Sequence, residues 1–216
     1  MERILTINSQ EYQERYQEAQ RMDFLREDAT DEIVEVLINA KEKIQEEQEK
    51  GKKVVVVNAT WDLLHMGHMW YLQTLERKIL DQFGISRQDL YLMVGVEWDQ
   101  RVKERKWNNR PIYSDWIRQQ MILNQQQVDD TYKYEYMDED RRPSDVALFL
   151  EPDWVVLHEE HLDTADKVMK VYRKLSYDDI KLILLRVKDS RKYGVPNYPE
   201  EYWVSTTNTL NHIKQM

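Results

Sequence analysis

The sequence predicts an α/β protein of the Rossmann-like class, with a parallel five-stranded sheet flanked by helices. Short continuous apolar runs recur along the chain, which is typical of strands buried on both faces of a sheet. Segments with helical periodicity separate these runs, and this alternation of strands and helices favours a parallel sheet. Ligands of such sheets bind outside the carboxyl ends of the strands.

The apolar runs and the periodic segments give the expected elements in order. Strands are predicted at about 53–57, 90–96, 154–157 and 180–187, with a weaker strand near 131–136. Helices are predicted at about 66–83, 114–126, 144–150, 163–175 and 206–214.

The first part of the chain differs in composition from the rest. Residues 1–52 are polar and rich in Glu, Gln and Lys, and within them 31–50 carry apolar residues in a roughly helical stripe that Gly51 ends. We therefore expect an N-terminal helical extension over 1–52 that packs on a main domain over 53–216. The residue pattern assigns no function to this extension.

Composition excludes several functional classes. The net charge of −9 disfavours nucleic acid and anionic membrane surfaces as partners. Cysteine is absent, which excludes disulfides and thiolate chemistry. No apolar stretch approaches the roughly 18 residues of a membrane span, and the N-terminus has no apolar signal-peptide region. A cytoplasmic protein without a membrane span is expected.

The stretch NATWDLLHMGH, residues 58–68, places His65 and His68 directly after the first predicted strand. Histidines three residues apart share one face of a helical turn, and the start of a helix attracts anions. Gly67 would let a phosphate approach closely, and imidazole N–H groups donate to phosphoryl oxygens. This pattern indicates a phosphate site, although the spacing alone also fits two ordinary histidines.

The longer string WDLLHMGHMWYLQTL resembles the signature of the HxGH nucleotidyltransferase superfamily. It is closest to the branch of the glycerol-3-phosphate and choline-phosphate cytidylyltransferases. Trp61 stands where this branch usually has Phe, and Ala59 where it usually has Gly. The matching residues are Thr60, Asp62, Leu63, Leu64, His65, Gly67, His68 and Leu72.

Three further segments resemble the same superfamily in the expected order, so the resemblance covers about 53–214. VGVEWDQRVKERKWNNRPI supplies Asp99, Lys103 and Lys106. RPIYSDWIRQQMILNQQQVDD supplies Arg118. WVSTTNTLNHI supplies the hydroxyl residues Ser205, Thr206 and Thr207 at the start of the last predicted helix.

The resemblance implies the Rossmann-like nucleotidyltransferase fold and the transfer of a nucleotidyl group from a nucleoside triphosphate to a phosphorylated small molecule, with release of pyrophosphate. It implies catalytic roles for His65 and His68 at the α-phosphate, with Lys103 and Arg118 supplying positive charge. Asp99 and Lys106 are expected to bind the acceptor. The residues expected to bind the nucleotide are Thr60, Trp61, Asp62, Gly67, Ser205, Thr206 and Thr207. Mg²⁺ is expected with the triphosphate, and no protein side chain is assigned to it.

Departures from the family pattern leave the nucleotide open. The cytidylyltransferases carry R-T-x-G before the hydroxyl element, and here residues 200–203 read EEYW. CTP is ranked first, and an adenylyltransferase that uses ATP and a sugar phosphate is the alternative. A non-catalytic nucleotide-binding scaffold is a further alternative, whereas a metal hydrolase built on His158 and His161 has little support. Related cytidylyltransferases are commonly dimers, so a homodimer is also expected.

Overall fold

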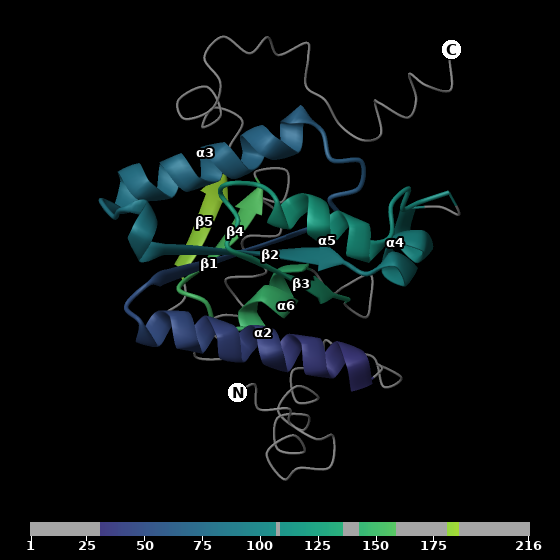
Figure 1. Ribbon diagram of the computed structural model, residues 1–216, viewed down its shortest axis with the longest axis horizontal. Helices are drawn as coiled ribbons and strands as arrows, with labels where there is room; N and C mark the ends of the chain where they lie inside the picture. Colours follow the sequence, from purple (N-terminus) through teal and green to yellow (C-terminus); the bar gives the residue numbers. More distant parts are fainter. Residues whose placement is uncertain (1–30, 107–108, 136–142, 159–180, 186–216) are drawn as a thin grey trace.

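A computed structural model describes residues 31–106, 109–135, 143–158 and 181–185 (Figure 1). These residues form a five-stranded sheet in the order β3-β2-β1-β4-β5, and every neighbouring pair of strands is parallel. The parallel α/β architecture predicted from the sequence is therefore confirmed.

All five predicted strands are present. They are β1 (Lys53–Ala59), β2 (Leu90–Glu97), β3 (Asp130–Tyr134), β4 (Trp154–His158) and β5 (Lys181–Leu185). The helices are α2 (Asp31–Glu49), α3 (Met66–Phe83), the short 3₁₀ helix η1 (Arg87–Asp89), α4 (Asp99–Lys106), α5 (Asp115–Leu123) and α6 (Pro143–Phe149). The helices predicted at 163–175 and 206–214 lie outside the described residues.

Strand β1 lies at the centre of the sheet, which explains why its sequence is a continuous apolar run. Val55 and Val57 pack with α3 on one face, and Val54 and Val56 pack with α2 on the other. Neighbouring residues of a strand point to opposite faces, so both faces of this strand need apolar side chains.

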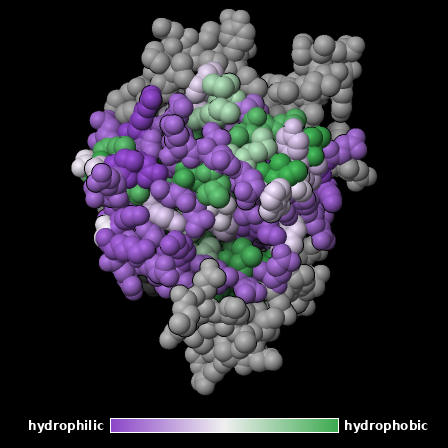
Figure 2. Space-filling view, in the orientation of Figure 1, coloured by the Kyte–Doolittle hydropathy of each residue, from purple (hydrophilic) through white to green (hydrophobic). Residues whose placement is uncertain are grey.

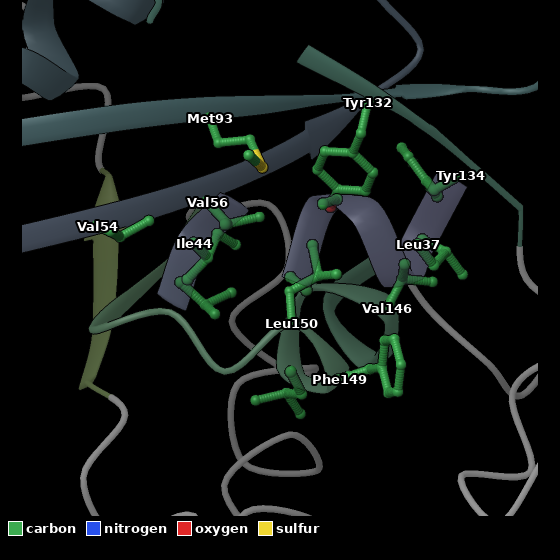
Figure 3. Packing of buried hydrophobic residues seen from close by; sticks show 14 of the residues in the cluster. Leu37, Ile44, Val54, Val56, Met93, Tyr132, Tyr134, Val146, Phe149 and Leu150 are labelled. Atoms are coloured by element: carbon green, nitrogen blue, oxygen red, sulfur yellow. The ribbon is translucent and has the colours of Figure 1, made fainter. Parts of the chain in front are cut away.

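Helices cover both faces of the sheet, with α3 and α5 on one side and α2 and α6 on the other (Figure 1). Helix α3 buries Leu72, Leu75 and Ile79 against the sheet. On the opposite face, α2 packs Leu37 and Ile44 among side chains from the strands and α6 (Figure 3). The helix predicted in the N-terminal extension is thus a layer of the fold, while the division of the chain after residue 52 stays a prediction.

The face seen in Figure 2 is largely polar, with apolar side chains gathered over part of it. The large apolar side chains that are exposed come mostly from α5 and the loop before it: Met66, Ile112, Tyr113, Trp116, Ile117 and Leu123. Among the described residues, no helix is long and apolar enough to cross a bilayer.

The carboxyl ends of β1 and β2 lie side by side, because Ala59 pairs with Val96 in the parallel register. The chain leaves β1 toward α3 and leaves β2 toward α4 at this edge of the sheet. The residues singled out by the HxGH string and by the segment that follows the second strand therefore meet at one edge, as expected for a parallel sheet.

Candidate active site

His65 and His68 form a stacked pair at the N-terminus of α3. Their ring centroids are 4.0 Å apart and the ring planes differ by 23°. His65 is the N-cap of the helix, and its Nδ1 accepts the backbone N–H of Gly67 at 3.1 Å. The Nδ1 of His68 accepts the backbone N–H of His65 at 3.4 Å, so the two rings cap the helix reciprocally.

These contacts determine the tautomer of each ring. A neutral imidazole whose Nδ1 accepts a hydrogen bond carries its proton on Nε2. Burial lowers the pKa of His65, and burial together with the neighbouring His65 and Lys106 lowers the pKa of His68 to about 3. At neutral pH both rings are therefore uncharged and present Nε2–H as a donor.

The Nε2–H group of His65 has no hydrogen-bond acceptor among the described residues. This nitrogen is also buried. A buried N–H without a partner is costly, and such groups are rare in folded proteins. An oxygen of an anionic ligand would satisfy this donor.

The loop between β1 and α3 adopts a backbone that is unusual for its residues. Trp61 and Leu63 have φ values of 55° and 51°, in the left-handed region that favours glycine. The indole Nε1–H of Trp61 donates to the carbonyl of Gly95 at 3.0 Å, and Trp61 is buried against the edges of the His68 and Tyr71 rings. Trp61 thus packs within the protein and supports His68, which differs from the nucleotide contact that the resemblance implied.

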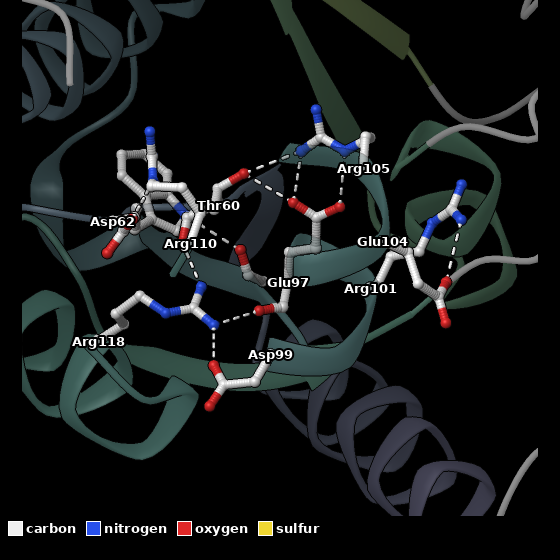
Figure 4. Close-up of polar contacts among 11 residues, drawn as sticks. Thr60, Asp62, Glu97, Asp99, Arg101, Glu104, Arg105, Arg110 and Arg118 are labelled. Atoms are coloured by element: carbon white, nitrogen blue, oxygen red, sulfur yellow. Dashed lines mark hydrogen bonds and ion pairs between the residues drawn. The ribbon is translucent and has the colours of Figure 1, made fainter. Parts of the chain in front are cut away.

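Arg118 joins the ends of β1 and β2. Its side chain is fully buried, and its guanidinium donates to the carbonyls of Thr60, Glu97 at 2.6 Å and Tyr113 at 3.0 Å, and to Oδ1 of Asp99 at 2.6 Å (Figure 4). In this arrangement Arg118 holds main chain from three segments together, and Asp99 is its counter-ion. Both roles differ from the substrate contacts that the resemblance implied for these residues.

A second arginine neutralises a buried carboxylate at the same edge. Arg105 donates from Nε to Oε1 of Glu97 at 3.1 Å and from Nη2 to Oε2 at 2.6 Å. The hydroxyl of Thr60 donates to Oε2 of Glu97 at 2.6 Å and accepts from Arg105 Nη2 at 3.0 Å (Figure 4). Burial alone would raise the pKa of Glu97, but the bonds from Arg105 and Thr60 lower it, so this carboxylate is ionised.

A third arginine pairs with Asp62 in the loop before the histidines. Nε of Arg110 lies 2.5 Å from Oδ2 of Asp62. Oδ1 of Asp62 accepts the backbone N–H groups of Ile112 at 2.9 Å and Tyr113 at 3.3 Å. The side chain of Asp62 is fully buried. It therefore fixes the loop before His65 to the segment before α5.

Lys106 brings excess positive charge to this edge. Burial and the neighbouring Arg105 lower the pKa of Lys106 to about 8, against the opposing effects of Glu97 and Asp62. At neutral pH the ammonium group is thus still mostly protonated. The arginines at this edge are each paired with one carboxylate, whereas no described residue forms an ion pair with Lys106. The local charge is therefore positive on a chain whose net charge is −9.

The structure brings together most of the predicted site residues that it describes. Thr60, Trp61, Asp62, His65, Gly67 and His68 lie on the loop after β1 and the first turn of α3, and Asp99, Lys106 and Arg118 lie beside them on α4 and α5. Lys103 is exposed on α4. Ser205, Thr206 and Thr207 lie outside the described residues, as does His161, while His158 is the last residue of β4.

Sequence reasoning assigned no role to Glu97, Arg105 or Arg110. All three lie in the quoted segment VGVEWDQRVKERKWNNRPI, but neither burial nor pairing of a charged residue can be read from an apolar pattern. A signal was nevertheless present, because Glu97 directly follows an apolar strand at the edge where ligands bind.

No family model matches this chain. It is similar to the bifunctional protein HldE of Campylobacter fetus, with 36% identity over 106 residues, which covers 49% of this chain and 20% of the relative. The HldE protein of Campylobacter jejuni subsp. doylei is 34% identical over 128 residues, covering 57% of this chain and 25% of the relative. The chain thus spans about a fifth to a quarter of the length of these curated relatives.

Similar solved structures include a lipopolysaccharide core biosynthesis protein from Thermoplasma volcanium, with 23% identity and a TM-score of 0.45, which covers 63% of this chain and 96% of that chain. A pantoate-beta-alanine ligase from Francisella tularensis has 13% identity and a TM-score of 0.43, covering 83% of this chain and 76% of that chain. The sequence similarity to the HldE proteins extends over about half of this chain.

Proposed function

We propose that this chain is a nucleotidyltransferase, and specifically an adenylyltransferase that moves AMP from ATP to a sugar phosphate and releases pyrophosphate. The observation that carries the proposal is the pair of neutral imidazoles at the start of α3, each with Nδ1 occupied by a backbone N–H. This geometry leaves two Nε2–H donors at a helix N-terminus beside an uncompensated lysine.

The arrangement suits the chemistry of phosphoryl-type transfer. A phosphate oxygen of the acceptor attacks the α-phosphorus of ATP, and the bond from that phosphorus to the bridging oxygen of the β-phosphate breaks. Pyrophosphate leaves with the electron pair of the broken bond. The Nε2–H groups of His65 and His68 donate to the non-bridging oxygens of the α-phosphate, where charge is redistributed in the transition state.

Neutral imidazoles fit this task because a fixed N–H dipole needs no proton transfer to stabilise an oxyanion. Lys106 supplies the positive charge that the histidines lack. The ion pairs of Arg105 and Arg118, together with Asp62, hold the loop and the strand ends, so the donors are in place before the substrate binds.

Among the described residues, magnesium fits this site through the substrate. The carboxylates of Asp62, Glu97 and Asp99 are each engaged by an arginine, and among the described residues no group of three or more His, Cys, Asp or Glu could hold a metal ion. Mg²⁺ would therefore take its ligands from the triphosphate and water, and it would neutralise charge on the leaving pyrophosphate.

Two observations favour ATP over CTP. The similarity to the HldE proteins fits an adenylyltransferase acting on a sugar phosphate better than it fits a cytidylyltransferase. The cytidylyltransferase element R-T-x-G is also replaced, at residues 200–203, by EEYW. The order in which the sequence analysis ranked the two nucleotides is therefore reversed here.

The test is release of pyrophosphate by the purified chain with Mg²⁺, one of ATP or CTP, and a panel of sugar phosphates, with the nucleotide sugar identified by mass spectrometry. ATP should support turnover with at least one acceptor. Replacing either His65 or His68 by Ala should lower kcat by at least about 100-fold, the scale of losing a transition-state donor. Faster turnover with CTP than with ATP would support a cytidylyltransferase instead. Nucleotide binding without turnover of any acceptor in the panel would support a non-catalytic nucleotide-binding scaffold.

A further inference from the structure

Arg110 differs from the other arginines at this edge in how its guanidinium is used. Arg118 directs Nε and both terminal nitrogens to acceptors within the protein. In Arg110 only Nε donates a hydrogen bond to a described residue, and its acceptor is the carboxylate of Asp62. Within the described part of the chain its Nη1 and Nη2 have no hydrogen-bond partner, and neither is among the buried polar atoms without one, so both terminal nitrogens reach solvent.

Asp62 fixes the direction of this guanidinium. Its Oδ2 takes the Nε–H of Arg110, while its Oδ1 is occupied by the backbone N–H groups of Ile112 and Tyr113. Only about a tenth of the Arg110 side chain is exposed, so the stem is held by packing. A guanidinium held at Nε presents its two terminal nitrogens as a fork, which matches two oxygens of one phosphoryl group.

The fork lies in the same charged environment as the proposed catalytic residues. Arg110 interacts electrostatically with Lys106, and Lys106 with His68. Two neighbouring cations, of which one has no carboxylate partner, repel each other. A phosphoryl anion between them would remove that repulsion, and because the site is partly buried the gain would be larger than at an exposed surface.

We propose that Arg110 binds a phosphoryl group in this site through Nη1 and Nη2, with Asp62 holding its Nε. The proposal rests on the proposed function for the identity of the ligand, which is either the triphosphate or the phosphate of the acceptor. It gives Arg110 the phosphate contact that the sequence resemblance had implied for Arg118.

The test uses the full chain and measures binding of inorganic tripolyphosphate and of inorganic phosphate by titration calorimetry, together with the KM values for ATP and for the acceptor. The key variant is Arg110→Lys, which keeps a charge that can pair with Asp62 but removes the fork. Arg110→Gln removes both the charge and the fork. Arg77→Gln is the matched control, since Arg77 is exposed on α3 and its loss changes the net charge equally.

Arg110→Lys should keep the thermal midpoint of the wild type and weaken anion binding by about 10- to 100-fold, the loss expected for a charge-assisted bidentate contact. A loss confined to tripolyphosphate and to the KM for ATP would assign the fork to the triphosphate. A loss confined to phosphate and to the KM for the acceptor would assign it to the acceptor. Arg77→Gln should leave all four quantities unchanged.

The contrary result is an Arg110→Lys variant that binds both anions with the affinity of the wild type and keeps both KM values. That result would leave Arg110 with a purely structural role even if the wild-type chain is an active transferase. Conversely, a wild-type chain that never releases pyrophosphate, but whose binding of tripolyphosphate or phosphate depends on Arg110, would refute the proposed reaction and leave the anion site standing.

Discussion

The rings of His65 and His68 stack at 4.0 Å between centroids, and each Nδ1 accepts a main-chain N–H of the first turn of α3. One pair of side chains therefore does two tasks. The Nδ1 atoms cap the helix, as a serine or aspartate oxygen does at other helices. The Nε2 atoms remain for a ligand, and capping fixes both their protonation and their direction.

The two tasks of His65 can be separated by substitution. In His65→Asn the amide oxygen occupies the place of Nδ1 and keeps the cap, but nothing replaces Nε2. In His65→Gln the amide nitrogen reaches the place of Nε2, but the cap is lost. We expect the Asn variant to unfold at the wild-type temperature and to lose at least about 100-fold in kcat.

The Gln variant should show the opposite pattern. Loss of the cap should lower its free energy of unfolding by about 1 kcal/mol, while its kcat should exceed that of the Asn variant. Thermal unfolding and steady-state kinetics of both variants provide the measurement. An Asn variant with the kcat of the wild type would show that Nε2 of His65 is not a donor in the reaction.

The pH dependence of anion binding should report Lys106. Its pKa is lowered to about 8 by burial and by Arg105, so the ammonium loses its proton as the pH rises through that value. After correction for the ionisation of the anion itself, the affinity for tripolyphosphate should fall above about pH 8. In Lys106→Arg the decline should disappear, because the guanidinium stays charged. A decline at the same pH in this variant would assign the titration to another group.

The acid side of the rate profile should lack a histidine step near pH 6.5. Burial, with the neighbouring His65 and Lys106, lowers the pKa of His68 to about 3, so the donor on this ring stays neutral in mild acid. We expect the rate of pyrophosphate release to show no acid limb caused by His68 between neutral pH and about pH 5. An acid limb near pH 6.5 that His68→Asn abolishes would indicate a histidine that must act as a base.

Replacing Arg118 should lower the free energy of unfolding, because its side chain holds buried parts of the fold together. Replacing it by Met would leave the carboxylate of Asp99 without its partner and the carbonyls of Thr60 and Glu97 without donors. The free energy of unfolding in urea should fall by about 3 kcal/mol or more, as expected when one partner of a buried pair is removed. Arg77→Gln is the exposed control. A Met variant of wild-type stability that binds tripolyphosphate weakly would instead support the phosphate contact implied by the resemblance.

Glu47 lies on α2, which covers the face of the sheet opposite to α3. Burial would raise its pKa, but hydrogen bonds from Lys50, Lys52 and Lys43 lower it to about 2. Its stabilising contribution should be complete above about pH 4.5, the unfolded pKa, and should be lost as the pH falls toward 2.

At pH 7, Glu47→Gln should lower the free energy of unfolding by roughly 2 to 3 kcal/mol, the scale of such a pKa difference. The loss should shrink as the pH falls below 4.5. Glu46→Gln is the matched control, because Glu46 is exposed and its pairing with Lys43 is a surface contact. A stability difference between Glu47→Gln and the wild type that persists unchanged at pH 2 would exclude the ion pairs as its cause.

The sequence predicted most of the sheet because four of its five strands are short continuous apolar runs, whereas the signal of β3 is weaker. The VVVV run of β1 is typical of a strand covered on both faces, and the helix predicted at 66–83 matches α3 from Met66 to Phe83. Helix α4 was missed, since Val102 is its one buried residue and a charged segment shows no apolar stripe. The order of strands in the sheet could not be read either, because periodicity identifies strands but not their neighbours.

The site was predicted only in part, and for a physical reason. Short motifs singled out His65 and His68, whose catalytic role remains a proposal. The same motifs implied substrate contacts for Asp62 and Arg118, whose side chains form ion pairs and backbone contacts in the structure. A buried arginine and a substrate-binding arginine have the same sequence signature. Only their acceptors distinguish them, and these come from segments tens of residues away.

The central claim is that the paired imidazoles bind the α-phosphate of a nucleoside triphosphate. A crystal structure of the chain with Mg²⁺ and a non-hydrolysable analogue of ATP measures this most directly. Non-bridging oxygens of the α-phosphate should lie within hydrogen-bond distance of Nε2 of His65 and of His68. An analogue seated on the α2 face of the sheet, or with its triphosphate away from the first turn of α3, would contradict it.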